Sequence, residues 1–409
     1  MHCWCCVLRL RVVAANIVCS GRQPQEVPVV RIGFVGLLDA APLMVARERG
    51  LFEEERVQVQ LVRQPGWRAI RDGLNAGWLD LSHALLGASA MSQVGRDGYA
   101  ESVQTLMTLA RGGSCIVVSS RLAALDAFTP ASLGAAVRRV SQRNMLSCGH
   151  PARLSAEHFV LRDWLAQGGL KAGADAEFMP LTPSRMGEHL AKGYLDLFCA
   201  PEPWGLLAQR QGIGRIAACS VDVVPDHPEK VLVGRAAFVA RHEDEVIGAM
   251  RAVLRACQFC GEPANYPQIA AWLASEPYLN QPAELILQSL CIGPHSAGCD
   301  SLAATRRPEW QFRSFSPQGC FPSATHVVWM LAQMMRWGEI PAGFDAINVA
   351  RRSVQPNLFR TAAASLGIQT SSQEFPDMPL KHGTFNVEQP RAIGSIAALP
   401  KPVSWRMPA

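Results

Sequence analysis

Two passages far apart in the chain share one pattern, and this repetition restricts the fold more than any other feature of the sequence. The passages are NAGWLDLSHA at 75–84 and LAKGYLDLFCA at 190–200. In each, a helical pattern ends at a glycine, an aromatic residue follows, and Leu-Asp-Leu leads into an apolar run typical of a strand. A single short repeat also arises by chance, but two lobes built on the same α/β plan would produce this one.

The first ordered segment has the order strand, helix, strand. VVRIGFV at 29–35 is short, apolar and rich in β-branched residues, which is typical of a buried strand. The next stretch, 37–55, is an amphipathic helix with Pro42 near its first turn and Gly50 at its end. VQVQLV at 57–62 alternates as a second strand. This order favours a parallel α/β sheet.

Further candidate strands indicate where the chain passes between the lobes. IVVSS at 116–120 and VLVGR at 231–235 lie near these passages, and the region from 240 to about 365 is mostly helical. We therefore predict a leader or unstructured extension at 1–28, the first part of lobe 1 at 29–120, lobe 2 at 121–230, a return to lobe 1 with C-terminal helices at 231–367, and a flexible, proline-rich tail at 368–409.

Charge and cysteines bear on partners and on location. The formal net charge of the 409 residues is +5, and the basic residues are scattered, so we expect no direct contact with nucleic acid. The apolar N-terminus is interrupted by Arg9 and Arg11, and Val18 precedes Cys19 where a lipoprotein signal requires a small residue. Thirteen cysteines without regular spacing favour reduced thiols in a cytoplasm. A periplasmic protein anchored through a lipidated N-terminus, or an over-long start, remains the alternative.

The chain has no recognisable catalytic or metal-binding signature. It contains no GxSxG, no Walker A motif, no HExxH and no GxGxxG after a strand, and its histidines are dispersed. Cys257 and Cys260 form a lone CxxC, which favours buried helical cysteines over a zinc site. We therefore predict no catalytic residue, no metal and no cofactor, and a binding protein rather than an enzyme.

Several polar residues lie where strands are expected to end, which is where open α/β sheets bind ligands. Gly113 and Ser114, in Arg-Gly-Gly-Ser, suit a tight turn around an anion, although the same residues are common in ordinary loops. Lys230 precedes a strand near a passage between lobes, where it is either solvated or placed to meet an anion. The full set at such positions is Asp39, His83, Ser114, Glu202 and Lys230.

Seven blocks in the order found in one family carry a resemblance that spans residues 29 to 367. The chain resembles the nitrate/nitrite/bicarbonate-binding protein family, whose members are solute receptors of ABC transporters or cytoplasmic nitrate sensors. The blocks are RIGFVGLLDAAPLMVARERGLF, GWRAIRDGLNAGWLDLSHAL, LRDWLAQGGL, LDLFCAPEPWG, HPEKVLVGR, RACQFCGEPAN and FPSATHVVWMLAQMMRWGEI.

The resemblance implies a type II periplasmic-binding-protein-like fold, with mixed sheets flanked by helices and a mostly helical C-terminal region. It implies a small oxyanion, nitrate or nitrite, bound between the lobes, with Trp67 and Lys230 at the family's ligand-contacting positions. An indole N–H and an ammonium group are both donors, as an oxyanion requires. The implied partner is an ABC permease or an antiterminator-type regulatory protein. An enzyme on the same scaffold, like the thiamine-pyrimidine synthesis proteins, is the less favoured alternative.

Two departures from the family pattern concern the ligand. Ser114 follows Gly113 where the family usually has an amide side chain, and Glu157 stands where it tends to have a histidine, with His158 next to it. Because a carboxylate repels an anion, we expect either that His158 substitutes or that the ligand differs, for example bicarbonate or a pyrimidine- or sulfonate-type compound. The predicted ligand-binding residues are Trp67, Gly113, Ser114, His158, Glu202 and Lys230.

Overall fold

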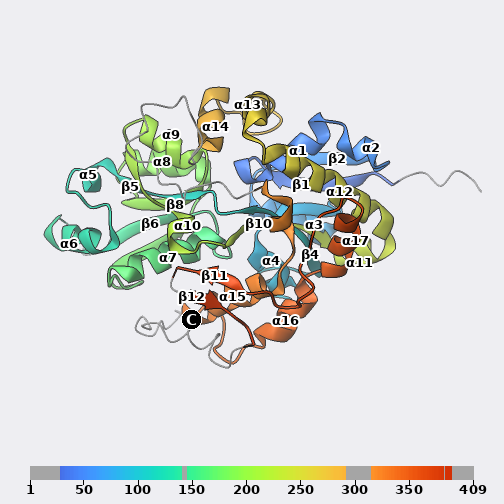
Figure 1. Ribbon diagram of the computed structural model, residues 1–409. Helices are drawn as coiled ribbons and strands as arrows, with labels where there is room; N and C mark the ends of the chain where they lie inside the picture. The colour runs from blue at the N-terminus through green and yellow to red at the C-terminus, as the bar shows by residue number, and fades with distance from the viewer. Residues whose placement is uncertain (1–27, 141–144, 292–314, 382, 389–409) are drawn as a thin grey trace, which may run out of the picture.

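The computed structural model describes residues 28–140, 145–291, 315–381 and 383–388. Two five-stranded mixed sheets form the centres of two lobes (Figure 1). The first sheet contains, in spatial order, β2 (Val59–Gln64), β1 (Val30–Val35), β3 (Leu81–Ala84), β10 (Pro228–Arg235) and β4 (Val103–Arg111). The second contains β7 (Ala176–Pro180), β6 (Leu146–His150), β8 (Leu197–Pro201), β5 (Ser114–Ser119) and β9 (Gly214–Cys219).

The two sheets share one topology. In each, three parallel strands joined by helices come first, and the next strand in space runs antiparallel to both of its neighbours. This antiparallel strand is β10 in the first sheet and β5 in the second. β5 comes directly after the strands of the first lobe in the chain, and β10 directly after those of the second. Within the described residues, the chain therefore crosses between the lobes at each of these two strands. The predicted fold class, two α/β lobes with mixed sheets, is confirmed.

Helices flank both sheets (Figure 1). The helices of the first lobe are η1 (Leu38–Ala40), α1 (Ala41–Glu48), α2 (Leu51–Glu54), α3 (Trp67–Ala76), α4 (Leu86–Ser92), α11 (Ala236–Arg241) and α12 (Glu243–Cys260). Those of the second lobe are α5 (Ser120–Ala123), α6 (Pro130–Val140), α7 (Ala156–Gln167), α8 (Pro183–Ala191), α9 (Trp204–Arg210) and α10 (Ser220–Val223). The C-terminal region has η2 (Pro263–Asn265), α13 (Tyr266–Leu273), α14 (Ala283–Leu290), η6 (Pro317–Cys320), α15 (Ala324–Arg336), α16 (Ala346–Ser353) and α17 (Pro356–Ala364).

The repeated Leu-Asp-Leu passages occupy equivalent places in the two lobes. Asp80, just before β3, donates its N–H to the carbonyl of Arg31 and accepts that residue's N–H on Oδ2 at 3.0 Å. Asp196, just before β8, makes the same two bonds to Ser147, with the N–H to Oδ2 distance also 3.0 Å. The glycines that end the preceding helices, Gly77 and Gly193, both have φ of 73°. The repeat in the sequence is therefore a structural repeat.

The chain passes into the second lobe before β5 and returns to the first lobe at β10. β5 belongs to the second sheet, so the first crossing falls at Gly112 and Gly113, earlier than the predicted boundary at 120. The return enters the first sheet at β10, where a boundary at 230 was expected. Both crossings therefore lie beside one another, since Gly112 donates its N–H to the carbonyl of His227.

The described part of the tail is packed against the protein, which corrects the expected flexible tail. Residues 378–385 contain a hairpin of β11 (Met378–Leu380) and β12 (Gly383–Phe385). The side chains of Met378 and Phe385 are buried in the core that spans both lobes. These two apolar residues are partners across the hairpin and attach it to the protein. The predicted leader at 1–28 falls, except for its last residue, outside the described residues.

The cysteine pair on α12 is buried, as expected for helical core cysteines. Cys257 and Cys260 have no exposed surface, and Cys257 Sγ lies 3.6 Å from Cys320 Sγ. Within the described ranges, no helix is both long and apolar enough to cross a bilayer, and no cluster of side chains there has the composition of a metal site.

Candidate functional site

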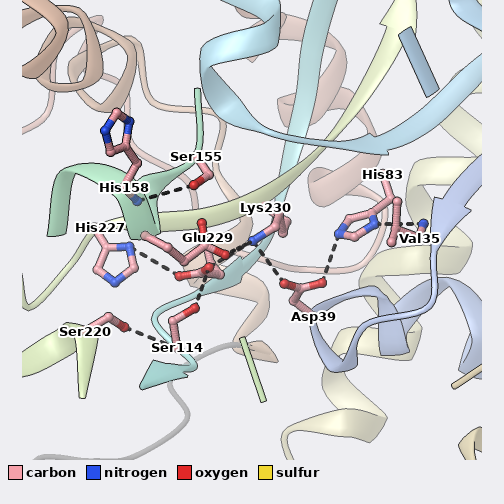
Figure 2. Close-up of polar contacts among 11 residues, drawn as sticks. Val35, Asp39, His83, Ser114, Ser155, His158, Ser220, His227, Glu229 and Lys230 are labelled. Atoms are coloured by element: carbon pink, nitrogen blue, oxygen red, sulfur yellow. Dashed lines mark hydrogen bonds and ion pairs between the residues drawn. The ribbon is translucent and has the colours of Figure 1, made fainter. Parts of the chain in front are cut away.

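A buried polar cluster lies where strands of both lobes meet (Figure 2). Its centre is Lys230 of β10, whose side chain has no exposed surface. The first lobe also supplies Asp39 of η1, which follows β1, and the second lobe supplies Glu157 from the first turn of α7. The cluster therefore joins the two lobes at the ends of their strands, the position at which α/β sheets bind ligands.

Three carboxyl groups surround the Lys230 ammonium group. Its Nζ lies 2.9 Å from Glu157 Oε1, 2.8 Å from Glu229 Oε1 and 3.2 Å from Asp39 Oδ2. The Trp67 ring forms one further side of the site, with its centroid 5.7 Å from Nζ. An ammonium group near an indole face is attracted to its π-electrons. Lys230 is thus held from both lobes.

An irregularity in β10 explains how the side chains of Glu229 and Lys230, which are adjacent in the strand, both enter the cluster. Side chains of adjacent strand residues normally point to opposite faces. The pairing of β10 with β4 shifts register on both sides of Lys230, which is typical of a bulge. The carboxyl group of Glu229 therefore lies close to the ammonium group of Lys230, although the two residues are adjacent in the strand.

Burial and charge act in opposite directions on the ionisable groups of the cluster. Burial alone would lower the pKa of Lys230, but Asp39, Glu157 and Glu229 raise it well above its usual range. Burial would raise the pKa of Glu157, yet Lys230 and a hydrogen bond from Glu229 lower it. For Glu229, burial and the neighbouring Glu157 charge raise the pKa well above its usual range. Glu229 therefore keeps its proton while Glu157 is ionised.

Asp39 contacts Lys230 with one carboxylate oxygen and His83 with the other. Its Oδ1 lies 3.0 Å from His83 Nε2, and the Val35 N–H donates to His83 Nδ1 at 3.4 Å. Because Nδ1 accepts a hydrogen bond, the ring proton lies on Nε2, facing Asp39. The Trp67 ring contacts the His83 ring in an edge-on arrangement, with centroids 5.2 Å apart. Asp39 is thus positioned between a histidine and a lysine, and its pKa is lowered although burial would raise it.

Two of the predicted residues lie at the crossing between the lobes, next to the cluster. Ser114 is fully buried, and its hydroxyl donates to Glu229 Oε1 at 2.8 Å. Gly113 has φ of 93°, a conformation that side chains disfavour, and its carbonyl accepts the Glu202 N–H. The structure therefore brings Trp67, Ser114 and Lys230 into one region, with Gly113 beside them. Whether they bind a ligand stays a prediction.

His158 does not join the cluster. Its Nδ1 lies 2.9 Å from the Arg153 carbonyl, and Arg162 Nε donates to its Nε2 at 2.8 Å. The ring also stacks on His150, with centroids 4.1 Å apart, and Figure 2 shows it turned away from Lys230. Glu157, one residue earlier on α7, faces Lys230 instead. The expectation that His158 replaces a histidine at this place is therefore not met by the geometry.

Glu202 is also separate from the Lys230 cluster. It follows β8, its Oε2 accepts the Leu206 N–H at 3.1 Å, and Ser289 lies 3.5 Å from the same oxygen. Burial raises its pKa to about 6. Glu202 therefore lies between the end of β8 and the first turn of α9.

An open pocket of about 410 Å³ lies beside the cluster, between the lobes. Val35, whose N–H bonds to His83, lines it from the first lobe, and Thr182 and Trp204 line it from the second. Trp204 Nε1 has no hydrogen-bond partner there. Trp204 thus lines the pocket between the lobes.

Four residues of the cluster were absent from the predicted set: Asp39, Glu157, Glu229 and His83. Asp39 follows β1 and His83 lies near the end of β3, so the strand-end rule identifies both as candidates. Glu157 was recognised only as a departure from the family pattern. Glu229 carries no signal in the sequence, because its contact with Lys230 depends on the bulge in β10.

Two mixed α/β sheets with a polar cluster between them define the periplasmic-binding-protein fold class. The crystal structure of the periplasmic nitrate-binding protein NrtA from Synechocystis superposes on this chain with a TM-score of 0.81 at 25% identity, covering 91% of this chain and 98% of that one. The NMT1-like family model matches residues 23–274, which is more than half of the chain. The protein therefore belongs to the NMT1-like family.

Curated relatives extend the similarity to transport components. The nitrate import ATP-binding protein NrtC of Synechocystis is 32% identical over 82% of this chain and 50% of its own length. The bicarbonate transport ATP-binding protein CmpC of Synechococcus elongatus is 30% identical over 93% of this chain and 56% of its own length. The chain thus spans about half the length of these two relatives.

Proposed function

We propose that the protein is a receptor for a small oxyanion, nitrate or nitrite, that binds between the two lobes. The observation that carries the proposal is the buried ammonium group of Lys230, held between the lobes beside the Trp67 ring. A buried cation supplies a charge-assisted hydrogen bond, and the protein around it excludes the water that would compete. No bond of the ligand has to break in such a role.

The relatives support a role in transport. NrtA is described as a nitrate-binding protein, and NrtC and CmpC as ATP-binding proteins of nitrate import and bicarbonate transport. We therefore propose components of an ABC transport system as partners. An antiterminator-type regulatory protein is the alternative partner, and it would make the protein a nitrate sensor.

We propose the cytoplasm as the location. The thirteen cysteines without regular spacing support this, because disulfide frameworks are rare in the cytoplasm. Mass spectrometry of the mature N-terminus tests it, and a protein that begins at a lipidated Cys19 would place it outside the cytoplasmic membrane instead.

Bicarbonate is a second candidate ligand, favoured by one specific observation. Glu157 Oε2 is a buried oxygen of an ionised carboxylate. Nitrate offers only acceptors, whereas bicarbonate has an O–H group that can donate to this carboxylate oxygen. A buried acceptor that gains a donor no longer carries its full desolvation cost.

A thermal-shift panel tests the proposed function. Sodium nitrate, nitrite and bicarbonate, a pyrimidine and a chloride control are added to the full chain. A ligand at a hundred times its Kd stabilises the folded state by about 2.7 kcal/mol, so a true ligand raises the Tm by several degrees. If no oxyanion raises the Tm above chloride, the proposal is wrong.

The matched variants Trp67→Ala and Trp78→Ala locate the response. Trp67 lies beside Lys230 at the start of α3, whereas Trp78 follows the end of that helix and is 40% exposed. We expect Trp67→Ala to abolish the anion-dependent shift and Trp78→Ala to keep it. An unchanged shift in Trp67→Ala would mean that this ring only packs.

A further inference from the structure

The contact between Glu157 and Lys230 occupies the position that a bound anion needs. Glu157 comes from α7 of the second lobe and Lys230 from the sheet of the first, and both side chains are fully buried. The carboxylate oxygen lies 2.9 Å from Nζ, the distance of a charge-assisted hydrogen bond. A solute anion that reaches Nζ from the second lobe therefore has to displace this carboxylate.

The net charge of the cluster disfavours the binding of a further anion. Lys230 is the cation, Asp39 and Glu157 are ionised, and Glu229 holds its proton, so the cluster already has one more negative than positive charge. The first turn of α7 also favours the ionised form of Glu157, because a helix N-terminus attracts negative charge. A carboxylate that loses its cation inside the protein is strongly destabilising.

The other groups around Glu157 do not supply a second cation. Burial lowers the pKa of His227 to about 4, and it lowers that of His150 to about 4 as well, so both rings are neutral near pH 7. Burial raises the pKa of Cys199 on β8, which keeps its thiol neutral. Ser114 donates to Glu229, and His83 lies beyond Asp39. Within the described residues, the charge of an incoming anion therefore has to be balanced at a carboxyl group.

We propose that this site binds its solute anion together with one proton, and that Glu157 is the group that takes up the proton when the anion displaces it from Lys230. The inference rests on the proposed function. The proton comes from solvent and forms the O–H bond of a neutral carboxylic acid, and no other bond changes. The acid can then donate to an oxygen of the anion, so that Glu157 determines both the affinity and the pH dependence of binding.

The direction of the pH dependence follows from the two states of Glu157. Without ligand, its pKa is held below the usual range by Lys230 despite burial. With the anion on Lys230, the same buried carboxyl loses that cation and its pKa rises. Between these two pKa values one proton is taken up for each anion, so the Kd for nitrate increases about tenfold for each unit of pH increase.

Isothermal titration of sodium nitrate into the full chain tests the inference. The titration is done at pH 5.5, 6.5 and 7.5, and at each pH in two buffers with different ionisation enthalpies, which gives the number of protons taken up. We expect about one proton for each nitrate and a Kd that increases about tenfold for each pH unit. The wild-type protein alone provides this readout, whatever the behaviour of a variant.

Two matched variants assign the proton to its group. Glu157→Gln keeps the shape and removes the charge, so we expect tighter nitrate binding at pH 7.5, no proton uptake and a Kd independent of pH. Glu229→Gln resembles the protonated state that Glu229 already has, so we expect it to keep the proton uptake of the wild type. Thermal unfolding of each variant shows that the protein titrated is folded.

The outcomes separate this inference from the proposed function. Nitrate binding to the wild type without proton uptake would overturn the inference and leave the proposed function standing. Proton uptake that persists in Glu157→Gln but disappears in Glu229→Gln would overturn the assignment to Glu157. A lack of nitrate, nitrite and bicarbonate binding to all three proteins across this pH range would overturn the proposed function, and the inference with it.

Discussion

Glu202 shows how a single buried carboxyl group makes stability depend on pH. Burial raises its pKa from 4.5 to about 6. Because the folded state binds this proton more tightly than the unfolded chain, stability is greater below pH 4.5 and is lost as the pH rises through 6. The pKa difference corresponds to a loss of about 2 kcal/mol above pH 6.

We expect Glu202→Gln to remove this loss. The free energy of unfolding of the variant, minus that of the wild type, should increase by up to about 2 kcal/mol between pH 4.5 and pH 7. The reason is that glutamine carries no charge to desolvate. Urea denaturation at a series of pH values measures the difference. A constant difference across this range would show that Glu202 does not titrate between pH 4.5 and 7.

At the residue scale, the sequence was informative about the cation and less so about the anions around it. Lys230 and Trp67 were recognisable because each lies in a block of the family pattern, and the structure places them 5.7 Å apart. His158 was preferred over Glu157 on chemical grounds, since a carboxylate repels an anion. That argument omitted Lys230 itself, which attracts the carboxylate first. A contact between residues 73 positions apart cannot be read from either residue alone.

The two Leu-Asp-Leu junctions are the clearest repeated element. Each aspartate links the start of one parallel strand to the start of its neighbour by the same pair of bonds. Asp80 has further partners, since Arg31 Nε lies 3.0 Å and Arg235 3.3 Å from its carboxylate. Asp80 is 2% exposed, whereas the Asp196 side chain is 14% exposed.

We therefore expect Asp80→Ala to destabilise the protein more than Asp196→Ala. The loss should be about 1–3 kcal/mol for Asp80, because a buried N–H and two arginines lose their acceptor. Asp72→Ala on α3, where the side chain is 52% exposed, is the matched control and should change the free energy of unfolding by less than about 0.5 kcal/mol. Chemical denaturation measures all three, and equal losses for Asp80 and Asp72 would contradict a structural role for the junction.

Element types were predictable from periodicity and turn residues, whereas element boundaries were not. The strand expected at 29–35 is β1 (Val30–Val35). The single helix expected at 37–55 is divided into η1, α1 and α2, and Gly50, in a left-handed conformation, separates α1 from α2. The hairpin β11–β12 was missed because a three-residue strand is too short to show alternation.

At the scale of the whole molecule, the C-terminal helix α15 connects the two lobes. α15 packs against α4 of the first lobe and α7 of the second. Its Gln333 donates to Asp163 of α7 at 2.6 Å, and Arg336 pairs with the same carboxylate. Figure 1 shows α15 below both lobes. α15 therefore links the two lobes on one side, and the pocket lined by Trp204 opens between them.

The central claim is that Lys230 holds a small oxyanion between the lobes. Isothermal titration of nitrate, nitrite and bicarbonate into the wild type and Lys230→Met tests it most directly, with circular dichroism at low temperature to show that the variant is folded. We predict one anion for each wild-type chain and a Kd at least about tenfold larger in Lys230→Met, because a charge-assisted hydrogen bond contributes about 1.5–3 kcal/mol. A folded Lys230→Met protein that binds the same anion with the wild-type Kd would contradict the claim.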